Sequence, residues 1–173
     1  MNFYSIALLA EAKPLIEKLE LKNSHDRLFS IYENSDTKLI ITGLGSINSS
    51  LATAYLLTKY GAKEDDFAFN FGLAGANFDC KIGDVFEVSK VIDSCSGSIL
   101  TLPKKGKKIL CHPTPVTKTT TKNTLVDMES YGFLKASKKF IKDENITIKK
   151  VVSDFLDAKV PTKEEVYKLM ENL

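Results

Sequence analysis

Arginine, tryptophan and histidine are scarce in this chain of 173 residues. Its 24 basic residues include a single arginine, Arg27, and there is no tryptophan and only two histidines. Arginine is the side chain whose planar fork suits phosphate, so a phosphate clamp built from several arginines is excluded. The formal net charge is +2, whereas a nucleic-acid-binding protein normally concentrates basic residues on one face. We therefore expect no nucleic-acid partner.

Cysteines and long apolar runs are also few. The cysteines, Cys80, Cys95 and Cys111, are odd in number, widely spaced and without a CxxC pair, which excludes a disulfide framework and a typical zinc site. No stretch approaches the roughly 18 apolar residues that a membrane-spanning helix needs. The first residues carry no basic region, and Glu11 interrupts the only early apolar run, unlike a secretory signal. We expect a cytoplasmic protein with no membrane partner and no metal.

The residues that are present suit one globular domain over 1–173. The chain is 43% hydrophobic and 27% charged, close to the average for such proteins. Strands are expected over 3–9, 28–32, 39–42, 67–71, 85–92, 108–111 and 148–152. Helices are expected to begin near Pro14, Gly43, Thr124 and Thr162, the last two at capping boxes. Because strands and helices alternate, we expect an α/β fold with a largely parallel sheet.

Two local patterns give sharper expectations. Five residues of the second helix recur at helical spacing and are expected on one apolar face: Ile47, Leu51, Ala54, Tyr55 and Leu57. The run 72–76 contains two glycines directly after an apolar strand, and we expect a tight turn there.

Carboxylates and glycine turns follow several of the expected strands. Ligands bind beyond the carboxyl ends of strands in open α/β sheets, and four segments fall there: 10–11, 43–46, 72–75 and 153–154. A fifth segment, 127–129, is expected in the first turns of a helix. Each has an ordinary explanation by itself, since an acid such as Glu11 suits a helix start and an aspartate such as Asp154 suits a turn.

The order of these segments is more informative than any one of them. They read strand–Glu11, strand–Gly43-Leu44-Gly45, Asn70-Phe71-Gly72-Leu73-Ala74-Gly75-Ala76, Lys81-Ile82-Gly83-Asp84-Val85, Val126-Asp127-Met128-Glu129-Ser130 and Val151-Val152-Ser153-Asp154. In this order they resemble the nucleoside phosphorylase/nucleosidase superfamily, and most closely its methylthioadenosine/S-adenosylhomocysteine nucleosidase branch. The likeness covers most of 3–93 and 123–157. It implies a three-layer αβα fold around a central mixed, mostly parallel twisted sheet.

The resemblance also implies a chemistry and a set of roles. The reaction is cleavage of the N-glycosidic bond of an adenosine-type purine nucleoside through an oxocarbenium-like sugar. Asp154 would protonate the leaving purine, helped by burial that raises its pKa. Glu129 would bind the sugar hydroxyls with Met128 against the ribose, and Glu11 would activate the attacking water. Further substrate-binding residues would be Gly45, Ala74, Gly75 and Ser153.

Three functions stay open on the sequence. Hydrolysis by water is favoured because Glu11 is retained and arginines are missing, and it needs no cofactor. A phosphorylase would use phosphate as co-substrate, which lysine can also bind. A non-catalytic nucleoside-binding relative is the third, because the chain is shorter than typical members, with a shortened, basic region at about 94–122. The resemblance implies a homo-oligomer, a dimer or larger.

Overall fold

Strands and helices alternate through most of the chain, as the computed structural model shows for residues 1–157 and 161–173. The strands are β1 (Asn2–Ile6), β2 (Lys22–Asn23), β3 (Ile31–Glu33), β4 (Thr37–Ile41), β5 (Phe67–Ala76), β6 (Val85–Asp93), β7 (Ile99–Thr101), β8 (Lys107–Cys111), β9 (Leu125–Asp127) and β10 (Ile146–Asp154). The helices are α1 (Leu9–Lys18), α2 (Ser46–Lys59), α3 (Ser130–Ser137) and α4 (Lys163–Met170), with a short 3-10 helix over Asp143–Asn145. The predicted α/β class is confirmed.

All ten strands belong to one sheet, and part of it closes on itself. The strand order is β10-β6-β8-β9-β5-β1-β4-β3-β2, and β10 also pairs with β5, so β5, β10, β6, β8 and β9 form a closed barrel. The expectation of a plain twisted sheet is wrong on this point. The reason lies in β5: its first residues pair with β1, whereas Gly75 and Ala76 pair with β9. The sheet is mixed, and its longest pairing, β5 with β10, is parallel.

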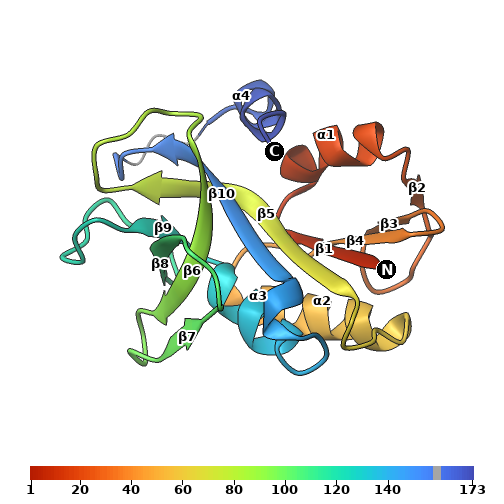
Figure 1. Cartoon of the computed structure of the whole chain (residues 1–173). Coiled ribbons are helices and arrows are strands. Elements are labelled where there is room, and N and C mark those ends of the chain that lie inside the picture. The colour runs from red at the N-terminus through yellow and green to blue at the C-terminus, as the bar shows by residue number, and fades with distance from the viewer. Residues whose placement is uncertain (158–160) are drawn as a thin grey trace.

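Helices cover the sheet from two sides, as the three-layer expectation requires. Figure 1 shows α2 and α3 together on one side and α1 and α4 on the other. The larger apolar core lies under α2 and α3 and includes Phe3, Leu56 and Phe133. A second core, which includes Ile6, Phe71 and Met170, lies under α1 and α4. None of the helices in the described ranges is long and apolar enough to cross a membrane.

Two local expectations near the site are wrong. The run 72–76 is not a turn but the second half of β5, because its backbone pairs with both β9 and β10. Thr124 and Asp127 do not cap a helix: they flank or end β9, and α3 begins later, at Ser130. Thr124 is buried, and its hydroxyl donates a hydrogen bond to the backbone oxygen of Lys108. Its side chain therefore stabilises the contact between β8 and β9. The capping box of Thr162 and Glu165 at α4 is confirmed.

The apolar face expected for α2 is only partly buried. Leu57 is in the core, but Ile47 and Leu51 are 78% and 62% exposed. The small residues Ala52 and Thr53 are buried in their place. Close packing between helices explains this choice, since a Cβ on Gly132 of α3 would lie 1.9 Å from the backbone oxygen of Ser46. Only small side chains permit such an approach at the start of α2, where Ile47 and Leu51 are left exposed, whereas Leu56 and Leu57 are buried further along the helix.

Candidate active site

Glu11 lies in the first turn of α1 and is buried against the middle of β5. Its Oε2 accepts a hydrogen bond from the Leu8 backbone N–H at 3.2 Å, and its Oε1 accepts a longer one from the Leu73 N–H at 3.4 Å. Glutamate at the third helical position commonly bonds back to the N-cap in this way. Glu11 therefore has the helix-start role expected from the sequence and also faces the segment 72–75.

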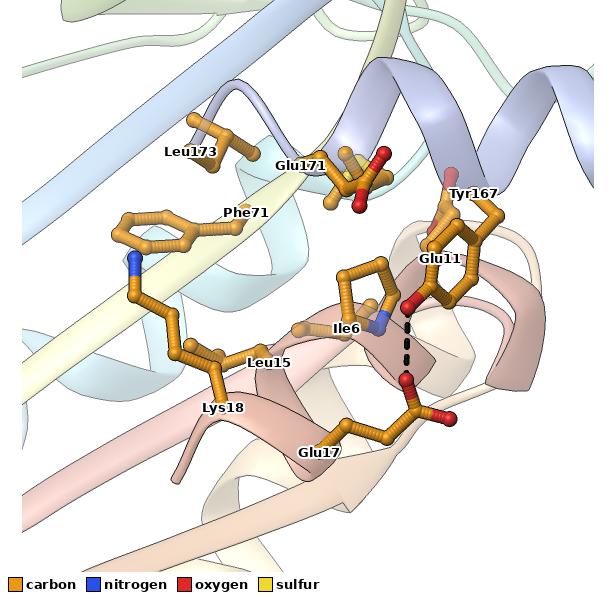
Figure 2. A pocket seen from close by; sticks show the side chains of 11 residues that line it. Ile6, Glu11, Leu15, Glu17, Lys18, Phe71, Tyr167, Glu171 and Leu173 are labelled. Atoms are coloured by element: carbon orange, nitrogen blue, oxygen red, sulfur yellow. Dashed lines mark hydrogen bonds between the residues drawn. The ribbon is translucent and has the colours of Figure 1, made fainter. Parts of the chain in front are cut away.

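A cavity of about 300 Å³ reaches Glu11 from the side of α1 and α4. Figure 2 shows its apolar floor, which includes Phe71 and Leu173, and the hydrogen bond of 2.6 Å that the Tyr167 hydroxyl donates to Glu17. Of the predicted catalytic carboxylates Glu11 and Asp154, Glu11 is the one that lines this cavity among the described residues. The Glu11 side chain thus lies between the cavity and residues 72–73 of β5.

Glu129 lies at the start of α3, near enough to Glu11 and Lys150 to feel their charges. It is the N-cap residue of α3, is buried, and its Oε1 accepts the Gly45 backbone N–H at 2.8 Å. Gly45 has a φ of 97°, a conformation in which a side chain is strained. The glycine that follows β4 therefore orients an N–H group toward Glu129. Met128, between Asp127 and Glu129, is half-buried.

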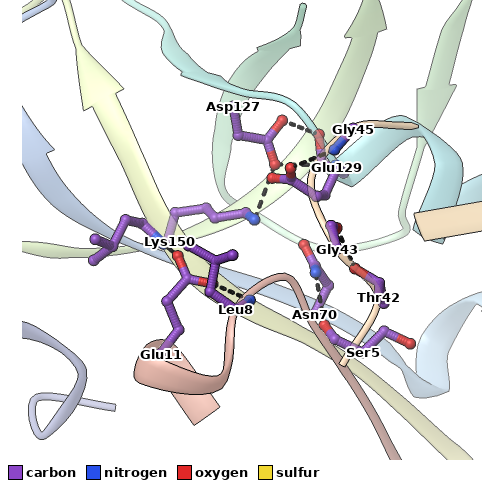
Figure 3. Close-up of polar contacts among 12 residues, drawn as sticks. Ser5, Leu8, Glu11, Thr42, Gly43, Gly45, Asn70, Asp127, Glu129 and Lys150 are labelled. Atoms are coloured by element: carbon purple, nitrogen blue, oxygen red, sulfur yellow. Dashed lines mark hydrogen bonds and ion pairs between the residues drawn. The ribbon is translucent and has the colours of Figure 1, made fainter. Parts of the chain in front are cut away.

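A buried lysine joins these two regions, and the sequence prediction did not include it. Lys150 of β10 is 1% exposed, and its Nζ lies 2.9 Å from Oδ2 of Asp127. Asp127 also accepts hydrogen bonds from the N–H and the hydroxyl of Ser130, at 3.0 and 2.7 Å. Figure 3 shows the lysine side chain running between Glu11 on one side and Asp127 with Glu129 on the other. The site therefore holds a cation surrounded by three carboxylates.

The sequence did contain a signal for Lys150. Ile146, Ile148 and Val152 are fully buried, and Lys150 occupies the same face at the period of two residues that a strand imposes. A lysine in the middle of a buried face needs a charged partner.

Asp154 ends β10 opposite Gly75 and is half-buried. Its Oδ1 accepts the Leu156 backbone N–H at 2.8 Å, and its Oδ2 accepts the Ser153 hydroxyl at 2.7 Å. Leu156 is buried with a φ of 62°, a strained conformation for leucine. A Cβ on Gly75 would meet Leu156 at 2.5 Å and Asp154 at 2.8 Å. Gly75 therefore makes the room in which Asp154 lies.

Four of the predicted site residues lie in or against the second half of β5: Ala74 and Gly75 belong to it, Glu11 accepts the Leu73 N–H, and Asp154 pairs opposite Gly75. Ala74 is buried in this strand, and its backbone oxygen lies 3.4 Å from the Ser153 hydroxyl. Ser153 contacts Asp154 and Ala74, so it positions the aspartate. Asp127, which the sequence suggested only as a helix cap, instead holds the lysine. Within the described residues no group of three or more histidine, cysteine, aspartate or glutamate side chains is arranged to hold a metal ion.

Burial and mutual repulsion perturb the carboxylates. Burial raises the pKa of Glu11, while Lys150 and the two backbone N–H groups oppose the rise. Burial, together with the charge of Asp127, raises the pKa of Glu129 to about 7. The charged form of a carboxyl is disfavoured by desolvation and by like charges, so at neutral pH this site retains a proton on Glu129 in part of the molecules.

Solved structures share this arrangement of strands and helices over nearly the whole chain. The 5'-methylthioadenosine/S-adenosylhomocysteine nucleosidase of Helicobacter pylori, with an inhibitor, superposes with a TM-score of 0.81 and 16% identity, over 99% of this chain and 93% of that one. The futalosine hydrolase of the same organism gives 0.80 and 15%, over 99% and 92%. The 5'-methylthioadenosine nucleosidase of Arabidopsis thaliana gives 0.79 and 20%, over 99% and 90%.

The fold is that of the methylthioadenosine nucleosidases. Comparison of the sequence with protein-family models and with curated proteins finds no match. At 14 to 20% identity the likeness establishes the architecture, which agrees with the resemblance drawn from the order of the motifs. The nucleosidase fold therefore rests on two separate comparisons, one of motif order and one of shape.

Proposed function

We propose that this nucleosidase-fold protein hydrolyses the N-glycosidic bond of an adenosine-type purine nucleoside and releases the free base. The observation that carries the proposal is the placement of three carboxylates from distant parts of the chain: Glu11 accepts the Leu73 N–H of β5 and Asp154 pairs opposite Gly75 of the same strand. Glu129 accepts the Gly45 N–H and lies near enough to Lys150 and Glu11 to feel their charges. Structures of the same fold include a nucleosidase of Colwellia psychrerythraea in complex with adenine. The neighbouring futalosine hydrolase makes a futalosine-like nucleoside a second substrate to test.

The proposed roles follow from where each group lies. Asp154, at the end of β10, protonates the leaving base, and a bound purine would complete the burial of this half-exposed side chain. Glu129 binds the sugar hydroxyls and favours the positive charge that develops on the sugar, and Met128 packs on the ribose. Glu11 orients and deprotonates the attacking water. Gly45, Ala74 and Gly75 line the sugar and nucleophile side of the site.

The charge of the site favours water over phosphate. Three carboxylates face one lysine, and that lysine is already paired with Asp127 at 2.9 Å. The single arginine, Arg27, lies between β2 and β3, the two strands at the far end of the sheet. A phosphate anion would enter a site with excess negative charge, which opposes its binding. We therefore place hydrolysis ahead of phosphorolysis and propose that no cofactor is needed.

A single assay tests this function. Methylthioadenosine, S-adenosylhomocysteine and futalosine are incubated with the protein in phosphate-free buffer and in about 50 mM phosphate, which is far above a typical KM. The release of free base is followed by chromatography. We expect release at the same rate in both buffers. Strict dependence on phosphate would show a phosphorylase, and binding of a nucleoside without turnover would show a non-catalytic relative.

We also propose that the protein forms a homo-oligomer through the exposed side of α2. Leu44, Ile47 and Leu51 are all at least half exposed. Ile47 and Leu51 lie one turn apart in α2, and Leu44 precedes its N-cap Gly45. Large exposed apolar side chains that lie close together are typical of an interaction site. We expect Ile47→Glu to convert the oligomer to a monomer by light scattering, whereas Lys63→Glu, at an exposed site beyond the end of α2, leaves it unchanged. A wild-type protein that is monomeric at about 50 µM, a concentration at which even a weak dimer forms, would contradict this.

A further inference from the structure

Lys150 has no part in the roles assigned above, yet it is among the most deeply buried polar groups of the chain. Its exposed fraction is 1%, and its Nζ lies 2.9 Å from Asp127. Asp127 is in turn fixed by both the N–H and the hydroxyl of Ser130. A buried ammonium is costly unless it is paired and hydrogen-bonded. The ion pair is therefore a rigid feature of the closed part of the sheet.

The other side of this ammonium faces Glu11. A Cβ built on Gly72 would lie 3.5 Å from Nζ of Lys150 and 3.7 Å from each carboxylate oxygen of Glu11. The two charged groups therefore flank the same small space beside Gly72 of β5. Opposite charges this deeply buried attract each other more strongly than charges at the surface, because burial limits screening by solvent.

We propose that Lys150 is a positioning residue of the site, which holds Asp127 in place and keeps the carboxyl of Glu11 in the ionised form that activates water. This proposal rests on the function proposed above. The lysine acts through Glu11 and does not itself exchange a proton with the substrate. Burial favours the neutral form of Glu11, and the nearby cation is the main opposing influence on its pKa.

Other charged groups face Glu11, and none of them replaces this cation. From β9 and the start of α3 come Asp127 and Glu129. Across the cavity, α1 and α4 contribute Glu17, Lys18, Tyr167 and Glu171. The acids repel a charge on Glu11, the phenol is neutral at pH 7, and Lys18 is an exposed residue screened by water. Among the described residues around Glu11, Lys150 is the buried cation.

The test is the pH profile of Lys150→Met, which removes the charge and retains an unbranched side chain, compared with Lys150→Arg, which retains the charge. Activity rises with pH as Glu11 loses its proton, so loss of the cation should move the acidic limb of kcat to higher pH. We expect a shift of about 1 pH unit or more for Lys150→Met, and of less than about half a unit for Lys150→Arg. A merely structural role would lower kcat without moving the limb.

A second readout does not depend on turnover. The ¹³C shift of the Glu11 side-chain carboxyl, assigned by its loss in Glu11→Gln, is titrated in the wild type and in the variants. If Lys150→Met does not fold because Asp127 is left unpaired, Asp127→Asn/Lys150→Met removes both charges, and the Glu11 pKa still rises because Lys150 influences it more than Asp127 does.

The possible results separate the two proposals. A wild type that releases no base from any nucleoside overturns the proposed function, and the Glu11 titration still decides the role of Lys150. An unchanged limb and an unchanged Glu11 titration in the charge-removing variant overturn the role of Lys150 while the hydrolase activity stands. An upward shift in Lys150→Met that Lys150→Arg does not show supports it.

Discussion

Asp154→Asn should reduce the release of adenine from methylthioadenosine by at least about 100-fold, since general acid catalysis contributes roughly 10² to 10⁴. The amide cannot supply a proton to the leaving base at neutral pH. The substitution keeps the shape of the site, because the amide oxygen can still accept the Leu156 N–H and the amide group can donate to the Ser153 hydroxyl. Initial rates followed by chromatography, with nucleoside binding measured by calorimetry, check both points.

The Ser153 hydroxyl is placed to serve as a hydrogen-bond partner of Asp154 throughout a proton transfer. The Ser153 hydroxyl lies 2.7 Å from Oδ2 of Asp154 and 3.4 Å from the backbone oxygen of Ala74. A hydroxyl both donates and accepts, so it can donate to the ionised aspartate, or accept from the protonated one while it turns to Ala74. Both protonation states of Asp154 therefore have a partner.

Two controls make the Asp154 result specific. Asp79→Asn, at an exposed position, should leave the rate unchanged. A riboside whose leaving group departs without protonation, such as p-nitrophenyl riboside, should lose much less rate in Asp154→Asn than methylthioadenosine does. Near-normal adenine release by Asp154→Asn, or equal losses on both substrates, would show that Asp154 is not the acid.

The order of the motifs predicted which segments meet, but not the path of the sheet. Carboxyl ends of neighbouring strands come together, and this rule placed Glu11, Gly45 and Asp154 at one end of the sheet. It could not show that β5 continues through 72–76. Glycine after a strand usually marks a turn, and pairing with β9 and β10 overrides that local preference.

The charged groups buried inside the sheet were harder to predict from the sequence than the segments at its edge. Asp127 follows a threonine by three residues, and this spacing favours a helix cap, whereas the closed barrel buries Asp127 beside Lys150. The ion pair of Asp127 and Lys150 joins β9 to β10, and the two residues are more than twenty positions apart in the sequence. No local sequence pattern therefore predicts it. The exposed Ile47 and Leu51 are a similar case: their spacing predicts an apolar face but does not say which face of α2 meets the sheet.

Glu11→Gln should lower kcat by about 10² to 10⁴ while KM changes little. The amide oxygen of glutamine can accept the shorter bond, from the Leu8 N–H, so the start of α1 keeps its cap. The longer bond from the Leu73 N–H, which goes to the other carboxylate oxygen, is lost. The substitution also removes the ability to take a proton from water. Glu17→Gln on the same helix is the matched control, because its amide still accepts the Tyr167 hydroxyl and we expect an unchanged rate.

The pH dependence separates a base from a structural carboxylate. Because burial raises the pKa of Glu11, wild-type kcat should fall as the pH decreases through a value above that of an ordinary glutamate, where the carboxylate becomes protonated and inactive. In Glu11→Gln this part of the profile should disappear. A variant that keeps the wild-type acidic limb, or that loses binding and rate equally, would assign Glu11 a structural role and leave the water to another base.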